Sequence, residues 1–313
     1  MCCTFEKARL SNTILLGVET EMVVDGEKTL VHLMGYQNIA ENLSPGPNAM
    51  ILPFPAANAM GPHSVLDTST YPKLLDNYAA ALQRRTRSVT KGSRGLMLNA
   101  DADSVQVFDS GKYTIVLATN PEDIPGALNQ VPEHKRPKLN EAIFSAYKKW
   151  YPNWPVALCC FGVEAKEEKV SSILQQARDS LSRKMFDYDS EDGPKMKSDP
   201  LLWWYVPSNP NKLFVPGLDA HDGGVPKLYE DVLVDHSVVF GSTLSPSGHS
   251  VPGWESIPAQ LKQYLPRLVV GSRMQDEFIP NGDFSLPVEL ARDAKLFEDQ
   301  NGMNNKRVLP PGA

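Results

Sequence analysis

The chain lacks any long hydrophobic run. Apolar stretches such as 31–34 and 156–161 end within a few residues, whereas a helix that crosses a bilayer needs about 20 consecutive apolar residues. The N-terminal segment already includes Glu6, Lys7 and Arg9, so it has no apolar centre of the kind that a secretory signal peptide requires. We therefore expect a soluble, cytoplasmic protein that has no membrane partner.

Cysteine is scarce. The 313 residues include four cysteines, which form two adjacent pairs, Cys2-Cys3 and Cys159-Cys160. Neighbouring residues on a strand point to opposite faces, so neither pair is placed to form an ordinary disulfide within itself. A bridge between the two pairs is an open alternative, and no CxxC or His-spaced pattern indicates zinc. We expect reduced thiols, as in the cytosol.

The sequence also has no cluster of basic residues. It contains 31 Lys and Arg against 37 Asp and Glu, for a formal net charge of −6, and the basic residues are scattered. Proteins that bind duplexes by neutralising phosphates need a basic stripe or patch. We therefore expect no nucleic-acid partner, and because no specific cofactor motif is present, we expect no cofactor.

Glycine and proline, by contrast, are frequent and dispersed. The chain has 21 Gly and 26 Pro residues, which separate short runs of β-branched and aromatic residues. Asp25-Gly26 and Gly111 are suited to tight turns between two such runs. These runs predict strands at 13–18, 29–34, 48–53, 105–108, 113–118, 156–161, 201–206, 212–215 and 232–240.

Helical spacing of apolar residues is less common. Leu74, Leu75, Tyr78 and Leu82 share one helical face and predict a helix at 71–84. Similar spacing predicts helices at 121–131, 139–150 and 164–186. We predict an α+β fold with a mixed or antiparallel sheet that contains the strands between 105 and 161. The helices at 71–84 and 139–150 are expected to pack on that sheet.

The domain organisation follows from changes along the chain. The acidic loop at 187–193 precedes a second set of strands, so we predict an α+β domain at 1–195 and a second β-rich region, packed on the first, at 196–274. The hydrophobic periodicity fades beyond 275, which predicts an extended C-terminal arm at 275–313 that is held by its own domain or by a neighbouring subunit.

Four short motifs carry a family resemblance. They are Leu-Pro-Phe-Pro at 52–55, Ser-Gly-Lys-Tyr-Thr-Ile-Val-Leu at 110–117 followed by Asn-Pro-Glu-Asp, Tyr-Lys-Lys-Trp-Tyr at 147–151 and Leu-Phe-Val-Pro-Gly-Leu at 213–218. In this order the segment from Tyr36 to His221 resembles an uncharacterised, mostly secreted bacterial family known as a domain of unknown function. The resemblance implies an α+β fold and no particular activity.

The N-terminus carries a second resemblance. Cys2, followed by Asn12-Thr13 and Gly17, is similar to the opening of the choloylglycine-hydrolase branch of N-terminal-nucleophile enzymes, although Val18 and Glu21 replace that family's arginine and aspartate. The resemblance implies an amide hydrolase in which removal of the initiator Met frees Cys2 as the nucleophile. Its own α-amino group, with a pKa near 8, would then accept the thiol proton. The alternative is that Cys2 is a small apolar residue at the start of a strand.

A loop rich in Asp and Gly is a second candidate site. Asp219 and His221 lie on this loop, and His236 follows on a predicted strand. Together the three would form the 2-His-1-carboxylate set that suits a divalent metal. Alternatively, the loop is a turn in which Asp side chains accept hydrogen bonds from backbone N–H groups.

Consecutive aromatic residues at 203–205 allow two interpretations. Adjacent side chains on a strand face opposite sides, so Trp203 and Tyr205 share a face while Trp204 lies on the other. Such rings stack on a sugar or a base in some proteins. We favour packing, with the strand buried on both sides.

The sequence favours a non-catalytic binding or assembly protein that forms a homo-oligomer or binds a protein partner. It is rich in strand edges and proline-bounded loops, and it has few polar residues that converge. The alternatives are an N-terminal-cysteine amide hydrolase that uses Cys2 and a metal-dependent site at Asp219, His221 and His236.

Overall fold

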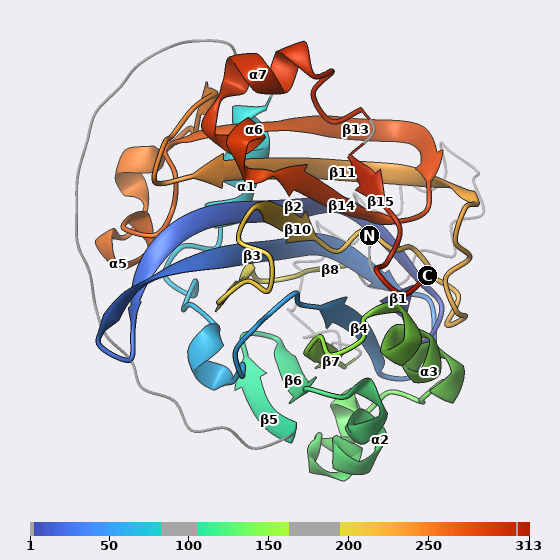
Figure 1. Cartoon of the computed structure of the whole chain (residues 1–313). Helices are drawn as coiled ribbons and strands as arrows, with labels where there is room; N and C mark the ends of the chain where they lie inside the picture. The colour runs from blue at the N-terminus through green and yellow to red at the C-terminus, as the bar shows by residue number, and fades with distance from the viewer. Residues whose placement is uncertain (1–2, 83–104, 163–194, 305) are drawn as a thin grey trace, which may run out of the picture.

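The computed structural model describes residues 3–82, 105–162, 195–304 and 306–313. Within these residues the strands form a seven-stranded, a five-stranded and a three-stranded sheet, accompanied by short helices. The seven-stranded sheet occupies the upper and middle part of Figure 1, and the five-stranded sheet lies below it. The fold is α+β, as the sequence predicts.

The seven-stranded sheet is mixed. Its strand order is β12-β13-β11-β2-β3-β8, and β9 also pairs with β3. β11 runs parallel to β2, whereas the other pairs are antiparallel. The strands are β2 (Ala8–Val24), β3 (Glu27–Asn42), β8 (Lys195–Lys197), β9 (Leu201–Tyr205), β11 (Asp231–Ser242), β12 (His249–Ser250) and β13 (Leu268–Pro280).

The long β2–β3 hairpin is the centre of this sheet. Its turn residues Asp25 and Gly26 have φ angles of 51° and 86°. Two consecutive positive φ values are typical of a type I′ turn, whose twist matches that of the flanking strands. The predicted Asp-Gly hairpin is therefore confirmed, and its strands extend well beyond the predicted runs.

The five-stranded sheet is antiparallel throughout. Its order is β1 (Cys3–Thr4), β4 (Asn48–Pro53), β7 (Val156–Phe161), β6 (Tyr113–Ala118) and β5 (Val105–Ser110). All residues of β7 are buried, which confirms the predicted central strand. β4 ends at Pro53, consistent with the inability of proline to donate to a ladder.

The helices are short and few. They are α1 (Leu74–Ala81), α2 (Ile124–Ala127), α3 (Glu141–Trp150), α5 (Ala259–Lys262), α6 (Val288–Arg292) and α7 (Ala294–Asp299), with 3₁₀ turns η1 (Pro62–Ser64), η2 (Pro121–Asp123), η3 (Leu128–Gln130), η4 (Glu133–Lys135) and η5 (Trp254–Ser256). The helix predicted at 164–186 lies outside the described residues. In the part of the chain that the structure describes, none of the helices has the length and apolar character needed to cross a membrane.

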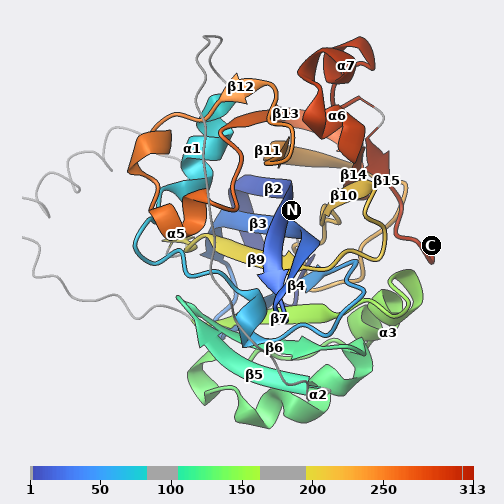
Figure 2. The same ribbon diagram turned by 60° about the vertical axis from the view of Figure 1, so that its left-hand side comes forward.

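The two predicted packing helices lie on different sheets. α3 buries Ile143, Phe144 and Tyr147 against the five-stranded sheet, as predicted. α1 instead packs its apolar face on the seven-stranded sheet, together with residues of α5. Figure 2 shows α1 and α5 on one side of this sheet. The three-stranded sheet of β10 (Lys212–Val215), β14 (Asp283–Pro287) and β15 (Arg307–Val308) lies on the other side. The periodicity of α1 identified its buried face, but not the sheet that covers it.

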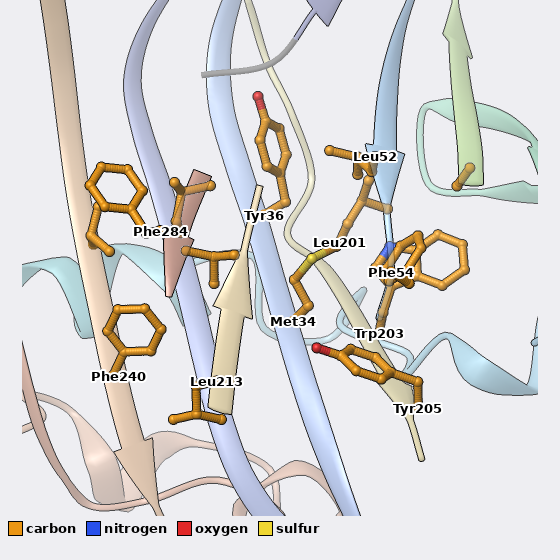
Figure 3. Close-up of a cluster of buried hydrophobic side chains, with 14 of the residues drawn as sticks. Met34, Tyr36, Leu52, Phe54, Leu201, Trp203, Tyr205, Leu213, Phe240 and Phe284 are labelled. Carbon is orange, nitrogen blue, oxygen red and sulfur yellow. The ribbon is translucent and has the colours of Figure 1, made fainter. Parts of the chain in front are cut away.

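The described residues form three hydrophobic clusters, and one of them joins side chains of the seven-stranded and five-stranded sheets. Figure 3 shows Met34 and Tyr36 of β3 between two groups of side chains, one around Trp203 and Phe54 and the other around Phe284. Trp203 is fully buried, and its ring centroid lies 4.9 Å from that of Phe54. Packing is therefore the correct interpretation of the aromatic run at 203–205.

The predicted division of the chain differs from the structure at two places. β2 and β3 lie between β11 on one side and β8 and β9 on the other, so strands of 196–274 share a sheet with the first region as well as packing on it. The segment 275–313 is also not an extended arm, because it contains the end of β13, the strands β14 (Asp283–Pro287) and β15 (Arg307–Val308), and the helices α6 and α7. β14 pairs with β10 (Lys212–Val215), which places this segment in the body of the molecule.

Candidate functional site

The loop at 217–230 connects β10 to β11 and contains two of the predicted metal ligands. His221 Nε2 lies 3.0 Å from Asp219 Oδ1. The side chain of Asn281 binds the backbone of this loop. Its Oδ1 accepts from the backbone N–H of Asp219 at 2.8 Å, and its Nδ2 donates to the Asp219 carbonyl at 2.9 Å. The side chain of Asp222 accepts from the N–H of Gly224 at 2.8 Å, so the turn interpretation is confirmed for that residue.

His236 lies on β11, deeper than the other two. Its ring is buried, and it meets Phe284 edge-on with a centroid distance of 6.5 Å. Burial, reinforced by the charges of Arg307 and His221, lowers its pKa well below 6.5. Among the described residues, no group of three or more His, Cys, Asp or Glu side chains is arranged to hold a metal ion. The predicted metal site therefore gains no support from this geometry.

A buried carboxylate lies next to this group. Asp283 is completely buried, and it accepts from the backbone N–H of Gly217 at 2.8 Å and from the hydroxyl of Tyr151 at 2.7 Å. Burial raises its pKa to about 6, although these hydrogen bonds and Arg307 act in the opposite direction. Burial lowers the pKa of Arg307 to about 10, and its guanidinium lies 4.1 Å from the ring centroid of Phe284.

The two regions singled out in the sequence lie side by side. Cys2 itself is outside the described residues. Cys3 forms a parallel bridge with Ala220, and its buried Sγ accepts from the hydroxyl of Tyr147 at 3.1 Å. The beginning of the described chain therefore lies against the Asp219–His221 loop, which sequence spacing alone does not reveal.

The buried thiols are poor nucleophiles. Cys3, Cys159 and Cys160 are all fully buried. Burial raises the pKa of Cys160 to about 12, which suppresses the reactive thiolate form. Among the described cysteines the structure therefore favours packing over reactivity.

An exposed apolar patch is the feature that sequence reasoning missed. Leu233 of β11 and Phe278 of β13 are direct cross-strand partners, and they are 55% and 71% exposed. Tyr229, which precedes β11, is 73% exposed. We call these three residues the β11–β13 patch. One signal was present: 232–234 is an uninterrupted apolar run between acidic residues, so its side chains face both sides of the strand.

The patch lies at the end of β11 that is not paired with β2. β2 pairs with β11 only from His236 onwards, so the first residues of β11 have β13 as their one described neighbour. Asp235 marks the end of this pairing, since its Oδ2 accepts from the N–H of Asn12 at 2.7 Å. A register shift follows between Val234 and Asp235, and Asp276 opposite it has a φ of 52°.

Beside the patch, the outer edge of β13 has no paired strand among the described residues. β12 pairs with β13 only at Leu268 and Val269. Across the described residues, no strand pairs with the outer edge of β13 from 270 to 280. In Figure 1 this part of β13 forms the upper margin of the seven-stranded sheet.

The patch has an acidic rim. Along 227–235 and 273–280 the chain carries five carboxylates but only two basic side chains, Lys227 and Arg273. The carboxylates belong to Glu230, Asp231, Asp235, Asp276 and Glu277. Asn281 joins this rim to the Asp219 loop, because its N–H donates to the Glu230 carbonyl at 2.8 Å. The patch and the loop thus belong to one end of the molecule.

A cavity of about 350 Å³ lies elsewhere, between the segment 62–69 and the β5–β6 turn. Its lining includes Asp67, Asp109 and Asp199. Two of these are engaged locally: Asp109 accepts from the Thr114 hydroxyl at 2.6 Å, and Asp67 accepts from the N–H of Ser69 at 2.9 Å. These bonds stabilise the turns around the cavity.

Comparison with known proteins is sparse. No family model matches the chain, and no curated protein matches it. Among solved structures the chain is similar to baculovirus P35, with a TM-score of 0.39 and 15% sequence identity over 93% of this chain and 92% of that one. The resemblances to the uncharacterised bacterial family and to choloylglycine hydrolases stay predictions.

Proposed function

We propose that this chain is a non-catalytic binding protein that docks an extended segment of another polypeptide on the β11–β13 patch and the adjoining edge of β13. The observation that carries the proposal is the cross-strand pair of Leu233 and Phe278, both more than half exposed. Contiguous exposed apolar side chains with a polar rim are typical of interaction sites.

The energetics favour a covered state. Burying a Leu or Phe side chain contributes about 1.5 to 3 kcal/mol each, and the unpaired backbone of an edge strand is a template for a further strand. Arg273, Asp276 and Glu277 interrupt the edge with charge, and the bulge at Asp276 changes its twist. These features disfavour indiscriminate pairing, so a partner must match the charges as well as the apolar residues.

A matched pair of variants tests the proposal. Leu233→Ser removes half of the cross-strand pair, while Leu244→Ser makes the same change at a residue that is 42% exposed beyond the opposite end of β11. The probe is a set of labelled peptides of about nine residues with alternating apolar side chains, measured by fluorescence anisotropy. We expect Leu233→Ser to weaken binding roughly tenfold, a loss of about 1.4 kcal/mol, and Leu244→Ser to leave it unchanged.

The homo-oligomer predicted from the sequence is an outcome of the same experiment. Light scattering over a range of protein concentrations measures the mass of wild type and Leu233→Ser. A dimer that Leu233→Ser dissociates would identify the occupant as a second copy of the chain. If no peptide binds and the wild type stays monomeric, the proposed function is wrong.

The amide-hydrolase alternative has its own test. Intact mass spectrometry reports whether the initiator Met has been removed, because only processing exposes the α-amine that would activate Cys2. A thiol-reactive probe then compares Cys2 with the buried Cys159. Retention of Met1, or equal slow labelling, would exclude Cys2 as an N-terminal nucleophile.

A further inference from the structure

We propose that the segment bound at the β11–β13 patch is basic as well as apolar, and that it lies along β13 as an added strand. This inference rests on the proposed function and specifies its partner. It is argued from the charges of the rim, the open backbone of β13 and the position of the apolar pair on one face of the sheet.

The charges of the rim select the sign of the partner. Glu230, Asp231, Asp276 and Glu277 are all exposed, and each lies within three residues of Leu233 or Phe278 along the chain. A partner with Lys or Arg at its polar positions would meet these carboxylates, and potentials of opposite sign accelerate association and raise specificity. An acidic segment would meet like charges instead. The proposal therefore commits to a cationic partner.

The same charges disfavour a second copy of the chain as the partner bound at the patch. Contact between two patches around a twofold axis would bring the acidic rims of both copies together. Arg273 is the one basic side chain on β13, so each copy could compensate only part of this repulsion. A basic segment from another polypeptide has no such cost.

The open edge of β13 determines the conformation of the partner. Along a strand, successive residues direct their N–H and C=O groups alternately to the two sides, so half of those from 270 to 280 point away from β11. An extended peptide satisfies these groups. Its alternate side chains then lie on the same face as Leu233 and Phe278, while α7 packs with the core on the other face.

Three peptides of about nine residues test the charge. They share the same alternating Val and Leu residues, and their polar positions carry Lys and Arg, Gln, or Glu. At about 0.15 M salt we expect the basic peptide to bind roughly tenfold more tightly than the Gln peptide, and the Glu peptide to bind least. The difference should shrink as salt is raised. Equal binding of the three peptides would overturn the inference but leave the proposed function intact.

Variants that remove two negative charges test whether the rim causes the preference for the basic peptide. Asp276→Asn with Glu277→Gln removes two rim carboxylates, and Asn tolerates the positive φ at position 276. The matched control, Asp123→Asn with Glu133→Gln, removes the same charges at exposed sites in η2 and η4, which precede and follow α2 in the chain. Figure 1 shows α2 at the opposite side of the molecule from β13. We expect the rim variant alone to weaken the preference for the basic peptide, since Glu230, Asp231 and Asp235 remain. If the control weakens the preference for the basic peptide as much, the preference reflects the overall net charge of the protein and the inference is wrong.

Backbone N-methylation tests strand addition. The basic peptide is methylated at one alternate set of amides or at the other, which leaves its charge unchanged. If it pairs with β13, one set weakens binding at least about tenfold and the other leaves it nearly unchanged. Equal effects of both sets would exclude an added strand. If no peptide binds at all and Leu233→Ser changes nothing, the failure lies in the proposed function itself.

Discussion

The two halves of the β11–β13 ribbon belong to the same pair of strands but lie in different surroundings. From His236 to Phe240, β11 is paired on both sides, and every residue from His236 to Ser242 is buried. From Asp231 to Asp235, β11 is not paired with β2, and Leu233 and its cross-strand partner Phe278 are exposed to solvent. Both halves carry three large apolar side chains, at 232–234 in one and at 238–240 in the other. The comparison teaches that neighbouring strands and helices, rather than residue type, decide which apolar side chains become core.

The largest contrast is expected from truncating one phenylalanine in each half. Phe240 is completely buried, so Phe240→Ala should lower the free energy of unfolding by about 3 to 5 kcal/mol through lost contacts and a cavity. Phe278→Ala removes an exposed ring and should change it by no more than about 0.5 kcal/mol. Urea denaturation measures both. Similar losses in the two variants would show that the patch is part of the core.

The pH dependence of stability tests the buried part of the sheet, which contains His32 and His236. Burial lowers the pKa of His32 from 6.5 to about 4, and that of His236 shifts the same way. The unfolded state therefore binds more protons in this range, and stability should fall as the pH decreases from about 6.5 to about 4, by at most about 3 kcal/mol for His32. Denaturant midpoints across this range measure the loss.

Asp283 should oppose this loss. Its pKa rises from 3.8 to about 6 on folding, so the folded state holds the proton and stability decreases as the pH rises from about 4 to about 6. Asp283→Asn removes this contribution, and we expect a steeper acid loss in the variant than in the wild type. A shallower acid loss in Asp283→Asn would contradict the assignment.

Ion pairs at the two ends of the ribbon should differ more modestly. At the buried end Glu19 is 0% exposed, and it accepts from Arg292 Nε and from the Ser242 hydroxyl. Arg292→Ala leaves this carboxylate without its cation and should cost about 2 kcal/mol. At the exposed end, Lys227→Ala removes a surface pair with Glu230 and should cost less than about 0.5 kcal/mol. Thermal unfolding of the two variants checks the order.

The smallest effect is expected at the bulge between the two halves. Asp276 has a φ of 52°, which Asn tolerates but a β-branched residue does not. Asp276→Val should therefore lower stability by about 1 kcal/mol, while Asp276→Asn should be nearly neutral. Hydrogen exchange at the adjoining β13 amides would show whether the strain stays local. Equal stability of the two variants would indicate that the bulge relaxes.

Much of the local structure was predictable because it depends on short segments. The turn at Asp25-Gly26, the β5–β6 hairpin and the fully buried β7 all follow from runs and turn residues that are adjacent in sequence. The proximity of Asp219 and His221 is local for the same reason, since only one residue separates them. The position of His236 beside them depends on the pairing of β11 in the sheet.

Turn residues and periodicity predicted the β2–β3 hairpin, the strands between 105 and 161 and the apolar face of α1, because backbone preferences and periodicity act over a few residues. The strands β13 and β14 were not predicted. Only the tertiary structure decided that α1 packs on the seven-stranded sheet, that 275–313 joins the body of the molecule, and that Cys3 lies against Ala220. It also left Leu233 and Phe278 exposed. The physical reason is that burial depends on which distant segment supplies the covering surface, and the amphipathic pattern of one segment does not specify its partner.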